Sequence, residues 1–287
     1  MTFVASEIAS QPSVWEQTGS VSLAGLPAAG ERVAVLGCGT SYFMAQAYAA
    51  LRESAGQGET DAWPASEFPA GRRYDRVVAF TRSGTTTEVL AALSRASAPT
   101  VVLTASPSTP VASVAGTVIS LPFADERSVV QTRFATAVLV LLRAHLGESV
   151  ASLPAAASAA LSSSLSPALS SASQFTFIGS GWAVGVAHEA ALKLREAAQV
   201  WTESYYAMEY RHGPVSIAAP GRVVWIFGSA PDGLLAELGA TGVHVEHSGL
   251  DPVVDLVRVQ RVAVELATGR GLNPDAPRHL DRSVILT

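Results

Sequence analysis

One arrangement of residues occurs in both halves of this chain, and it limits the possible folds more than any other feature. Residues 33–41 form an apolar run that ends in a Gly-Cys-Gly turn and leads into a segment of small, helix-forming residues. Residues 175–182 repeat this order with a Gly-Ser-Gly turn, and each half continues with a second apolar run, at 76–80 and at 222–227. Apolar strands that alternate with helices are typical of parallel sheets covered on both faces. The sequence therefore predicts an α/β protein.

The repeat predicts two doubly wound parallel-sheet domains in tandem, at residues 30–147 and 172–287, with right-handed crossovers. Residues 1–29 are expected to form a helical lead-in that packs on one domain. Residues 148–171 are dominated by Ser, Ala and Leu, a composition that also suits a flexible linker. Because the leucines fall at roughly helical spacing, we favour a helical connector.

Composition excludes several classes of function. The net charge is −5 and there is no dense run of Lys and Arg, which argues against a nucleic-acid partner. The one cysteine, Cys38, excludes an intrachain disulfide, and no Cys/His cluster has zinc spacing. The N-terminus lacks the features of a signal peptide, and the longest apolar run is too short to span a membrane. We therefore expect a cytoplasmic protein without a metal or a membrane partner, in which Cys38 is a small buried residue.

The glycine turns suggest anion binding, because the ends of parallel strands and the helix N-termini that follow them attract negative charge. A dinucleotide is the first candidate. The pattern G-x-G-x-x-G is broken in both halves, since Tyr42 and Val184 stand where the third glycine belongs. We therefore expect no nicotinamide or flavin cofactor, and a dehydrogenase is disfavoured.

A turn rich in hydroxyl groups follows the second strand of the first half. Residues 81–88 have the sequence Thr-Arg-Ser-Gly-Thr-Thr-Thr-Glu. Hydroxyls, backbone N–H groups and a helix dipole converge there, which suits a phosphate monoester. The alternative is that one hydroxyl caps the helix while the others face water. Capping leaves most of the hydroxyls unexplained, so we favour a phosphate site.

Lys193 is the only lysine among 19 basic residues. Lysine is compact and shifts its pKa readily, unlike arginine, so its retention at one position suggests a special role. Glu189, Lys193 and Glu196 share one face of a predicted helix, and His212 follows in the sequence Arg-His-Gly-Pro. Two alternatives remain open: Lys193 belongs to a surface Glu–Lys pair, and His212 merely closes a turn.

The chain resembles the sugar isomerase (SIS) family. It is similar to tandem SIS proteins, namely the isomerase half of glucosamine-6-phosphate synthase and the tagatose-6-phosphate ketose/aldose isomerase-like proteins. The resemblance implies two flavodoxin-like, three-layer α/β/α SIS domains. It rests on motifs spread over nearly the whole chain, at residues 37–42, 83–86, 190–196, 203–205, 211–214 and 273–280.

The resemblance also implies roles for individual residues. Glu196 matches the base that moves a proton between C1 and C2, and Lys193 matches its charge partner. His212 matches the group that opens the sugar ring and that comes from the neighbouring subunit, so a homodimer with shared active sites is implied. The residues that match the phosphate site are Ser41, Thr81, Arg82, Ser83 and Thr86, with the backbone near Val129.

One position departs from the family. Arg282 stands where the synthase has a lysine that forms a Schiff base, and a guanidinium is not expected to form that imine. Arg282 in a tail salt bridge is the alternative to a role in the site. No glutaminase half is present, so glutamine-dependent amidotransfer is not expected.

The resemblance and the residue types together predict an enzyme acting on a hexose or hexosamine 6-phosphate, either an aldose–ketose isomerase or an amino-sugar-phosphate deaminase. Such proton transfer needs a base and a group for the ring oxygen, but no redox cofactor. The alternative is a noncatalytic sensor that binds a phosphosugar.

Overall fold

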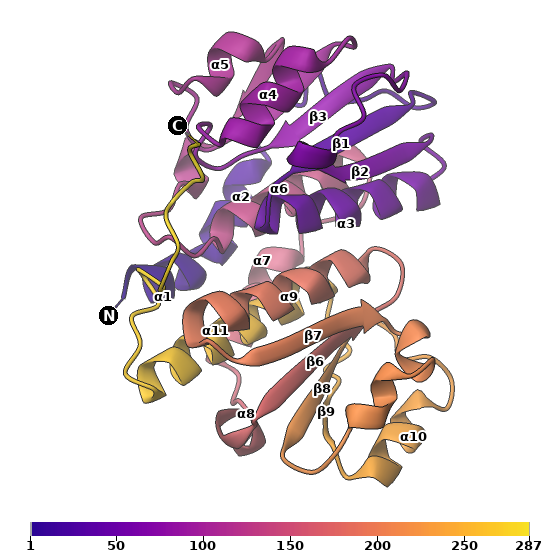
Figure 1. Ribbon diagram of the computed structural model, residues 1–287, viewed down its shortest axis with the longest axis vertical. Helices are drawn as coiled ribbons and strands as arrows, with labels where there is room; N and C mark the ends of the chain where they lie inside the picture. The colour runs from indigo at the N-terminus through magenta and orange to yellow at the C-terminus, as the bar shows by residue number, and fades with distance from the viewer. Residues whose placement is uncertain (1, 287) are drawn as a thin grey trace.

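The computed structural model describes residues 2–286 and contains two parallel β-sheets, one in each half of the chain (Figure 1). The predicted α/β class is therefore confirmed. Met1, the first residue of the predicted lead-in, and Thr287, the last residue of the predicted second domain, lie outside the described residues. No helix of the described part is long and apolar enough to cross a membrane.

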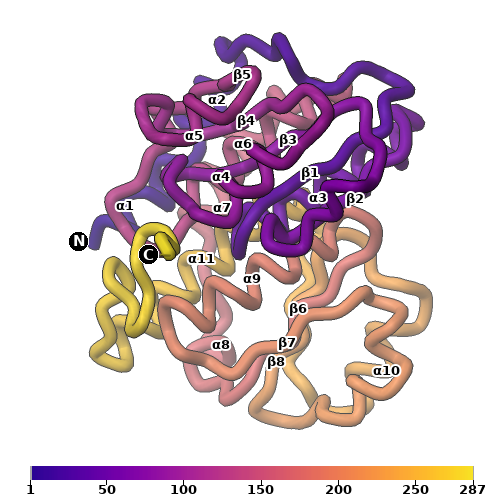
Figure 2. Tube along the Cα trace, turned by 45° about the horizontal axis from the view of Figure 1, so that its top comes forward, coloured from indigo at the N-terminus to yellow at the C-terminus, as the bar shows by residue number. Residues whose placement is uncertain are grey.

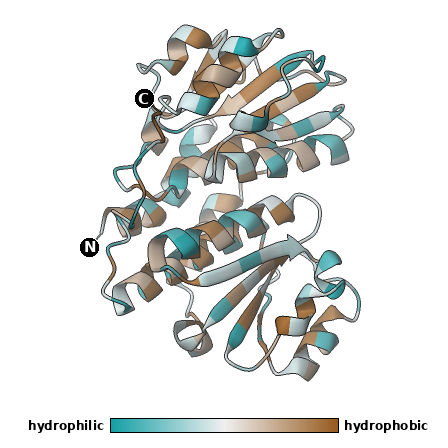
Figure 3. Ribbon diagram, viewed as in Figure 1, coloured by the Kyte–Doolittle hydropathy of each residue, from teal (hydrophilic) through white to brown (hydrophobic). Residues whose placement is uncertain are grey.

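The first sheet has five strands in the order β2-β1-β3-β4-β5, and all neighbouring strands are parallel. This is the order of a flavodoxin-like doubly wound sheet. Every residue of β1 and of β4 is buried, which explains why these strands are largely apolar, with threonine only at the two ends of β4. Figure 3 shows hydrophobic residues along the strands of this sheet. The strands are β1 (Val33–Gly37), β2 (Thr60–Pro64), β3 (Arg76–Phe80), β4 (Thr100–Thr104) and β5 (Thr117–Ser120).

The second sheet repeats the first four positions in the order β7-β6-β8-β9, again with parallel neighbours. Its strands are β6 (Gln174–Gly179), β7 (Trp201–Tyr206), β8 (Arg222–Phe227) and β9 (His244–Glu246). After β9 the chain enters a long helix, α11 (Pro252–Gly269), instead of a fifth strand.

Helices α3 and α9 follow the two glycine turns and lie between the two sheets, whereas α4 and α5 cover the outer face of the first sheet and α10 that of the second (Figure 1). The helices are α1 (Phe3–Ala9), α2 (Gln11–Thr18), α3 (Thr40–Ser54), α4 (Thr87–Arg95), α5 (Val111–Val114), α6 (Arg133–His145), α7 (Leu153–Ser162), α8 (Pro167–Ser171), α9 (Ala183–Ala198) and α10 (Leu234–Thr241). Four short 3-10 helices are η1 (Ala65–Glu67), η2 (Pro122–Ala124), η3 (Glu209–Arg211) and η4 (Pro214–Ile217).

The two halves share one hydrophobic core. The largest cluster of buried apolar residues contains members of both sheets and of the helices between them. A Cβ added at Gly185 of α9 would lie 2.5 Å from the carbonyl oxygen of Phe43 and 2.8 Å from the backbone nitrogen of Ala47, so α3 and α9 touch backbone to backbone. The prediction of two separate domains in tandem is therefore not supported, because small residues let the halves merge. The boundaries at 30–147 and 172–287 remain a prediction.

Both predicted helical segments form helices in the structure. Residues 148–171 contain α7 and α8, and α7 packs on α2 and α11. The N-terminal segment forms α1 and α2. The indole of Trp15 donates to Thr136 in α6 (2.9 Å), and the amide of Gln11 donates to Gln260 in α11 (2.7 Å). The lead-in thus bridges the halves instead of packing on one of them.

The last residues return to the first half as an extended tail. Residues 270–286 leave the end of α11, which lies beside α9, and run up to the first half, so that the C-terminus lies near α4 and α5 (Figures 1 and 2). The carboxylate of Asp275 accepts hydrogen bonds from the backbone of Phe3 (2.8 Å) and Val4 (2.7 Å). Farther along, Val284 accepts a hydrogen bond from the N–H of Thr87 at the start of α4 (3.2 Å).

Candidate active site

The carboxyl ends of β1 and β3 meet at the point where the strand order of the first sheet reverses, which is the usual ligand crevice of this fold. The turn at 38–41 and the turn at 81–86 enclose a cavity of ≈ 30 Å³ there. It brings together six of the seven residues predicted to bind substrate. The residues that line it are Cys38, Ser41, Phe80, Thr81, Arg82, Ser83, Thr86, Val89, Gln131 and Arg282.

The hydroxyl groups of the turn bond to backbone N–H groups and to other hydroxyls, within the turn and in the tail. Thr81 accepts from the N–H of Gly84 (3.2 Å), and Ser83 accepts from the hydroxyl of Thr85 (3.1 Å). The N-cap of α4 is Thr86, whose side chain makes no capping hydrogen bond. The capping alternative therefore does not account for this turn. Gly84 is required, because a Cβ there would lie 2.0 Å from the hydroxyl of Thr109 and φ is 65°.

Arg82 lines the cavity, but its guanidinium is occupied elsewhere. The side chain is buried and donates to the carbonyls of Ser128 (3.0 Å), Val129 (3.1 Å) and Arg282 (3.3 Å). It also faces the carboxylate of Glu126 at 3.4 Å. Arg82 thus fastens the turn to the 126–129 loop and to the tail.

Val129 and Arg282 also take structural contacts. The N–H of Val129 donates to Asp275 (3.0 Å), and Val129 does not line the cavity. Arg282 lines the cavity, and its guanidinium pairs with the carboxylate of Asp125 and donates to the carbonyl of Glu126. The structure therefore contains the tail salt bridge that was the alternative for Arg282.

Gln131 also lines the cavity, although the sequence analysis did not predict it. Its buried Oε1 has no hydrogen-bond partner among the described residues, and no motif pointed to it.

Lys193 is buried, with 1% of its side chain exposed, so the alternative of a surface pair is wrong. Its Nζ lies 2.6 Å from Oε2 of Glu196 and 3.4 Å from Oε1 of Glu189, and it donates to the hydroxyl of Thr40 (3.0 Å). Burial alone would lower the pKa of Lys193, but the charges of Glu189 and Glu196 outweigh it and raise the pKa. Because Thr40 belongs to the turn at 38–41, the lysine joins α9 to that turn.

Glu189 is the member of this cluster whose importance the sequence did not reveal. It lies one turn before Lys193, is fully buried, and neither carboxyl oxygen has a hydrogen-bond partner among the described residues. Burial raises the pKa of Glu189 to about 8, against the opposing charge of Lys193. Its i, i+4 spacing to the only lysine was visible, but its burial was not.

Glu196 lines a second and larger cavity of ≈ 510 Å³ at the C-terminal end of α9. The cavity is closed on one side by the tail, which continues from residue 280 to Arg282 in the cavity between the turns at 38–41 and 81–86. Glu196, this larger cavity and the small cavity between the two turns thus follow one another along the tail. The other lining residues are Leu192, Arg195, Gln199, Val200, Trp201, Thr202, Arg278, His279 and Leu280.

His212 is not brought to Glu196 by its own chain. It is exposed at the end of η3, and no residue of the 209–214 loop lines the cavity of Glu196. Its N–H donates to Glu209 (2.9 Å), so the backbone does close a turn, while the ring faces solvent.

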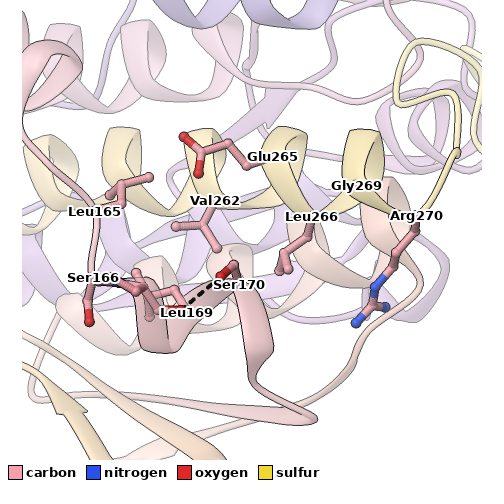
Figure 4. Close-up of a pocket in the computed structure, with 10 residues that line it drawn as sticks. Leu165, Ser166, Leu169, Ser170, Val262, Glu265, Leu266, Gly269 and Arg270 are labelled. Carbon is pink, nitrogen blue, oxygen red and sulfur yellow. Dashed lines mark hydrogen bonds between the residues drawn. The ribbon is translucent and has the colours of Figure 1, made fainter.

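Three other features of the described residues offer fewer groups that could take part in catalysis. A cavity of ≈ 260 Å³ lies between α8 and α11, where Glu265 and Arg270 are the charged groups (Figure 4). Burial raises the pKa of Cys38 to about 11, so its thiol is a poor nucleophile. No group of three or more His, Cys, Asp or Glu within the described range could hold a metal ion.

Comparison with known proteins identifies a domain family and several similar proteins. The SIS domain family model matches residues 28–146. A glutamine–fructose-6-phosphate aminotransferase (isomerizing) from Gloeobacter violaceus is 30% identical over 317 residues, which cover 88% of this chain and 52% of the relative. One from Methanothermobacter thermautotrophicus is 34% identical over 145 residues, or 40% of this chain and 25% of the relative. The chain thus spans about half the length of the first of these relatives.

Solved structures agree over the whole length. A glucosamine-6-phosphate deaminase from Thermotoga maritima is 25% identical with a TM-score of 0.82, covering 99% of this chain and 100% of that one. A tagatose-6-phosphate ketose/aldose isomerase from Escherichia coli shares the fold, with 18% identity, a TM-score of 0.76, and coverage of 98% and 97%. The family model stops at residue 146, so a second SIS domain remains a prediction. The chain therefore contains a SIS domain at residues 28–146 and has, over its length, the fold of the solved deaminase.

Proposed function

We propose that this protein is an enzyme that moves a proton between C1 and C2 of a hexose or hexosamine 6-phosphate, as an aldose–ketose isomerase or an amino-sugar-phosphate deaminase. One observation carries the proposal: Glu196, paired with the buried ammonium of Lys193, lines a chamber of ≈ 510 Å³ that adjoins the phosphate cavity along the tail. The names of the relatives, an isomerizing aminotransferase and a glucosamine-6-phosphate deaminase, support this substrate class.

The phosphate would bind at the two turns of the first sheet. The hydroxyls of Ser41, Thr81, Ser83 and Thr86 line that cavity, and the N-termini of α3 and α4 add partial positive charge. Binding the phosphate at one end directs the sugar along the tail toward α9. Positioning of this kind lets one carboxylate serve two adjacent carbons.

Glu196 would act as the base. Lys193 holds Oε2 at 2.6 Å, which leaves Oε1 free to take the proton from C2 of the aldose and return it to C1. The enediol formed between these steps needs no electron acceptor. Arg282 is tied to Asp125 and cannot form the family's imine, so we propose a route without a covalent bond to the tail.

A homodimer would complete the site. The edge strand β7 and the loop after it expose Tyr206 (53%) and Met208 (50%), four residues before His212. A second copy covering this surface could carry His212 into the neighbouring chamber, where it would open the sugar ring. We propose this shared arrangement, and a cytoplasmic location, on the strength of the family resemblance and these exposed groups.

A noncatalytic phosphosugar sensor is the alternative, and the cluster on α9 argues against it. A sensor needs the phosphate turn, whereas burying Lys193 beside two glutamates costs desolvation energy that binding alone does not require.

Proton NMR in deuterium oxide tests the proposal with a panel of aldose, ketose and amino-sugar 6-phosphates. We expect one of them to exchange its C2 proton or to release ammonia, and Glu196→Gln to abolish both while still binding the ligand. Binding without exchange in the wild type would favour the sensor. Full exchange by Glu196→Gln would remove Glu196 as the base.

A further inference from the structure

Two residues in the chamber of Glu196 have an unusual backbone conformation. Gln199 (φ 53°) and His279 (φ 65°) are the only non-glycine residues with positive φ among residues 2–286. Both line the ≈ 510 Å³ cavity, although one ends α9 and the other lies in the tail. Side chains on a left-handed backbone are costly, and such strain concentrates at functional sites.

The backbone at these positions does not require these side chains. Gln199 is the C-cap of α9, where its N–H donates to Arg195 (3.1 Å), and glycine is the preferred residue for such a cap. His279 lies where the tail turns, with Leu280 N–H bonded to Pro277 (3.3 Å), and glycine would also adopt this conformation at lower cost. The amide and the imidazole therefore need another explanation.

Both side chains are free to bind a ligand. Each is exposed, and neither hydrogen-bonds another residue of the part that the structure describes. An amide offers both donors and an acceptor, and a neutral imidazole offers one of each. By contrast, the guanidinium of Arg195 in the same cavity is engaged with the hydroxyl of Thr202 (2.9 Å). Hydroxyl groups, which donate and accept, are the partners that an amide and an imidazole fit best.

We propose that Gln199 and His279 bind the hydroxyl groups of the sugar, and so determine which phosphosugar is held against Glu196. This inference rests on the proposed function, since it takes the ligand to be a sugar phosphate. The phosphate turn would supply affinity common to all phosphate esters, and these two side chains would distinguish one polyol from another.

Calorimetry with two ligands tests the assignment. In a Glu196→Gln background, glucosamine 6-phosphate and fructose 6-phosphate report on the chamber and the turn together, whereas inorganic phosphate reports on the turn alone. Gln199→Gly and His279→Gly relieve the strain and delete one side chain each. We expect each to raise the Kd of at least one sugar phosphate roughly 3- to 10-fold, the range for one lost hydrogen bond, and to leave the Kd of inorganic phosphate unchanged.

His279→Asn and Ala276→Gly serve as controls. Asparagine tolerates the left-handed backbone, so His279→Asn tests the imidazole without a change in chain flexibility. Ala276 is exposed, belongs to the tail and does not line the chamber, so Ala276→Gly should leave every Kd unchanged. The melting temperatures of both glycine variants should equal or exceed that of the parent.

The outcomes separate this inference from the proposed function. If both glycine variants bind the sugar phosphates as tightly as the parent does, the inference about Gln199 and His279 is wrong, and the proposed function is unaffected. A glycine variant that also loses inorganic phosphate shows damage to the tail and counts against a direct contact. A parent protein that binds none of the three ligands overturns the proposed function, and this inference with it.

Discussion

Glu189→Gln should change how the stability of this protein depends on pH. The carboxyl of Glu189 is fully buried, and burial raises its pKa to about 8 from an ordinary value of 4.5. Between these two values the folded protein keeps the proton and the unfolded chain releases it. The folded state then binds more protons, so stability falls as pH rises through this window. Glutamine has the same shape and does not titrate, so the variant should lack this loss.

The magnitude follows from the width of the window. Each unit of pKa difference corresponds to about 1.4 kcal/mol. The free energy of unfolding of Glu189→Gln, minus that of the wild type, should therefore rise by about 1.4 kcal/mol per pH unit between pH 5 and 8 and level off above. Over this range the cumulative gain is on the order of 4 kcal/mol. Lys193 is not expected to contribute over this range, because its pKa is raised above an already basic value.

Urea unfolding at pH 5, 6, 7, 8 and 9 measures this difference. Glu196→Gln is the matched control, since Glu196 is on the same helix and bonds the same lysine but reaches the larger cavity. Parallel curves for wild type and Glu189→Gln would refute the reasoning, because they would show that Glu189 is already ionised in the folded protein.

Three further predictions concern the site. Replacing Ser83 and Thr86 together with alanine should weaken sugar-phosphate binding by about 1–3 kcal/mol, measured by calorimetry on a variant that still folds; unchanged affinity would exclude the turn. Mixing inactive Glu196→Gln with inactive His212→Asn should restore some activity once subunits exchange, and no recovery despite proven exchange would contradict shared sites. Borohydride added with fructose 6-phosphate should leave the protein mass unchanged, because Arg282 cannot form an imine. A stable adduct would contradict the proposed route without a covalent bond to the tail.

The parts of the fold that depend on local pattern could be predicted from the sequence. Fully buried parallel strands produce uninterrupted apolar runs, and the turns that follow them contain glycine, so both sheets and the turns after β1 and β3 were recognisable. The shared core was not. It depends on the contact of Gly185 with Phe43 and Ala47, and small residues are too frequent in this chain for that pair to stand out.

Most residues that line the candidate site could be predicted from the sequence, but the direction in which their side chains point could not. Arg82 lies in the turn that follows β3. Its guanidinium nevertheless points to the backbone carbonyls of residues 128, 129 and 282, which are distant in sequence. Lys193 was singled out by its rarity, but its burial depends on Thr40, which comes from the other half of the chain. Side-chain orientation of this kind is decided by tertiary contacts.

The contact at Gly185 also determines which part of the molecule can move. Because α3 and α9 meet there backbone to backbone, the halves cannot slide or hinge apart without separating two main chains that fit closely. By contrast, single hydrogen bonds attach the tail to the turn at 81–87: from Thr87 to Val284, from Leu286 to Thr87, between Thr85 and Ser283, and from Arg82 to Arg282. We therefore expect access to the turn at 81–86 to require that the tail detach from it, while the two halves of the molecule stay together.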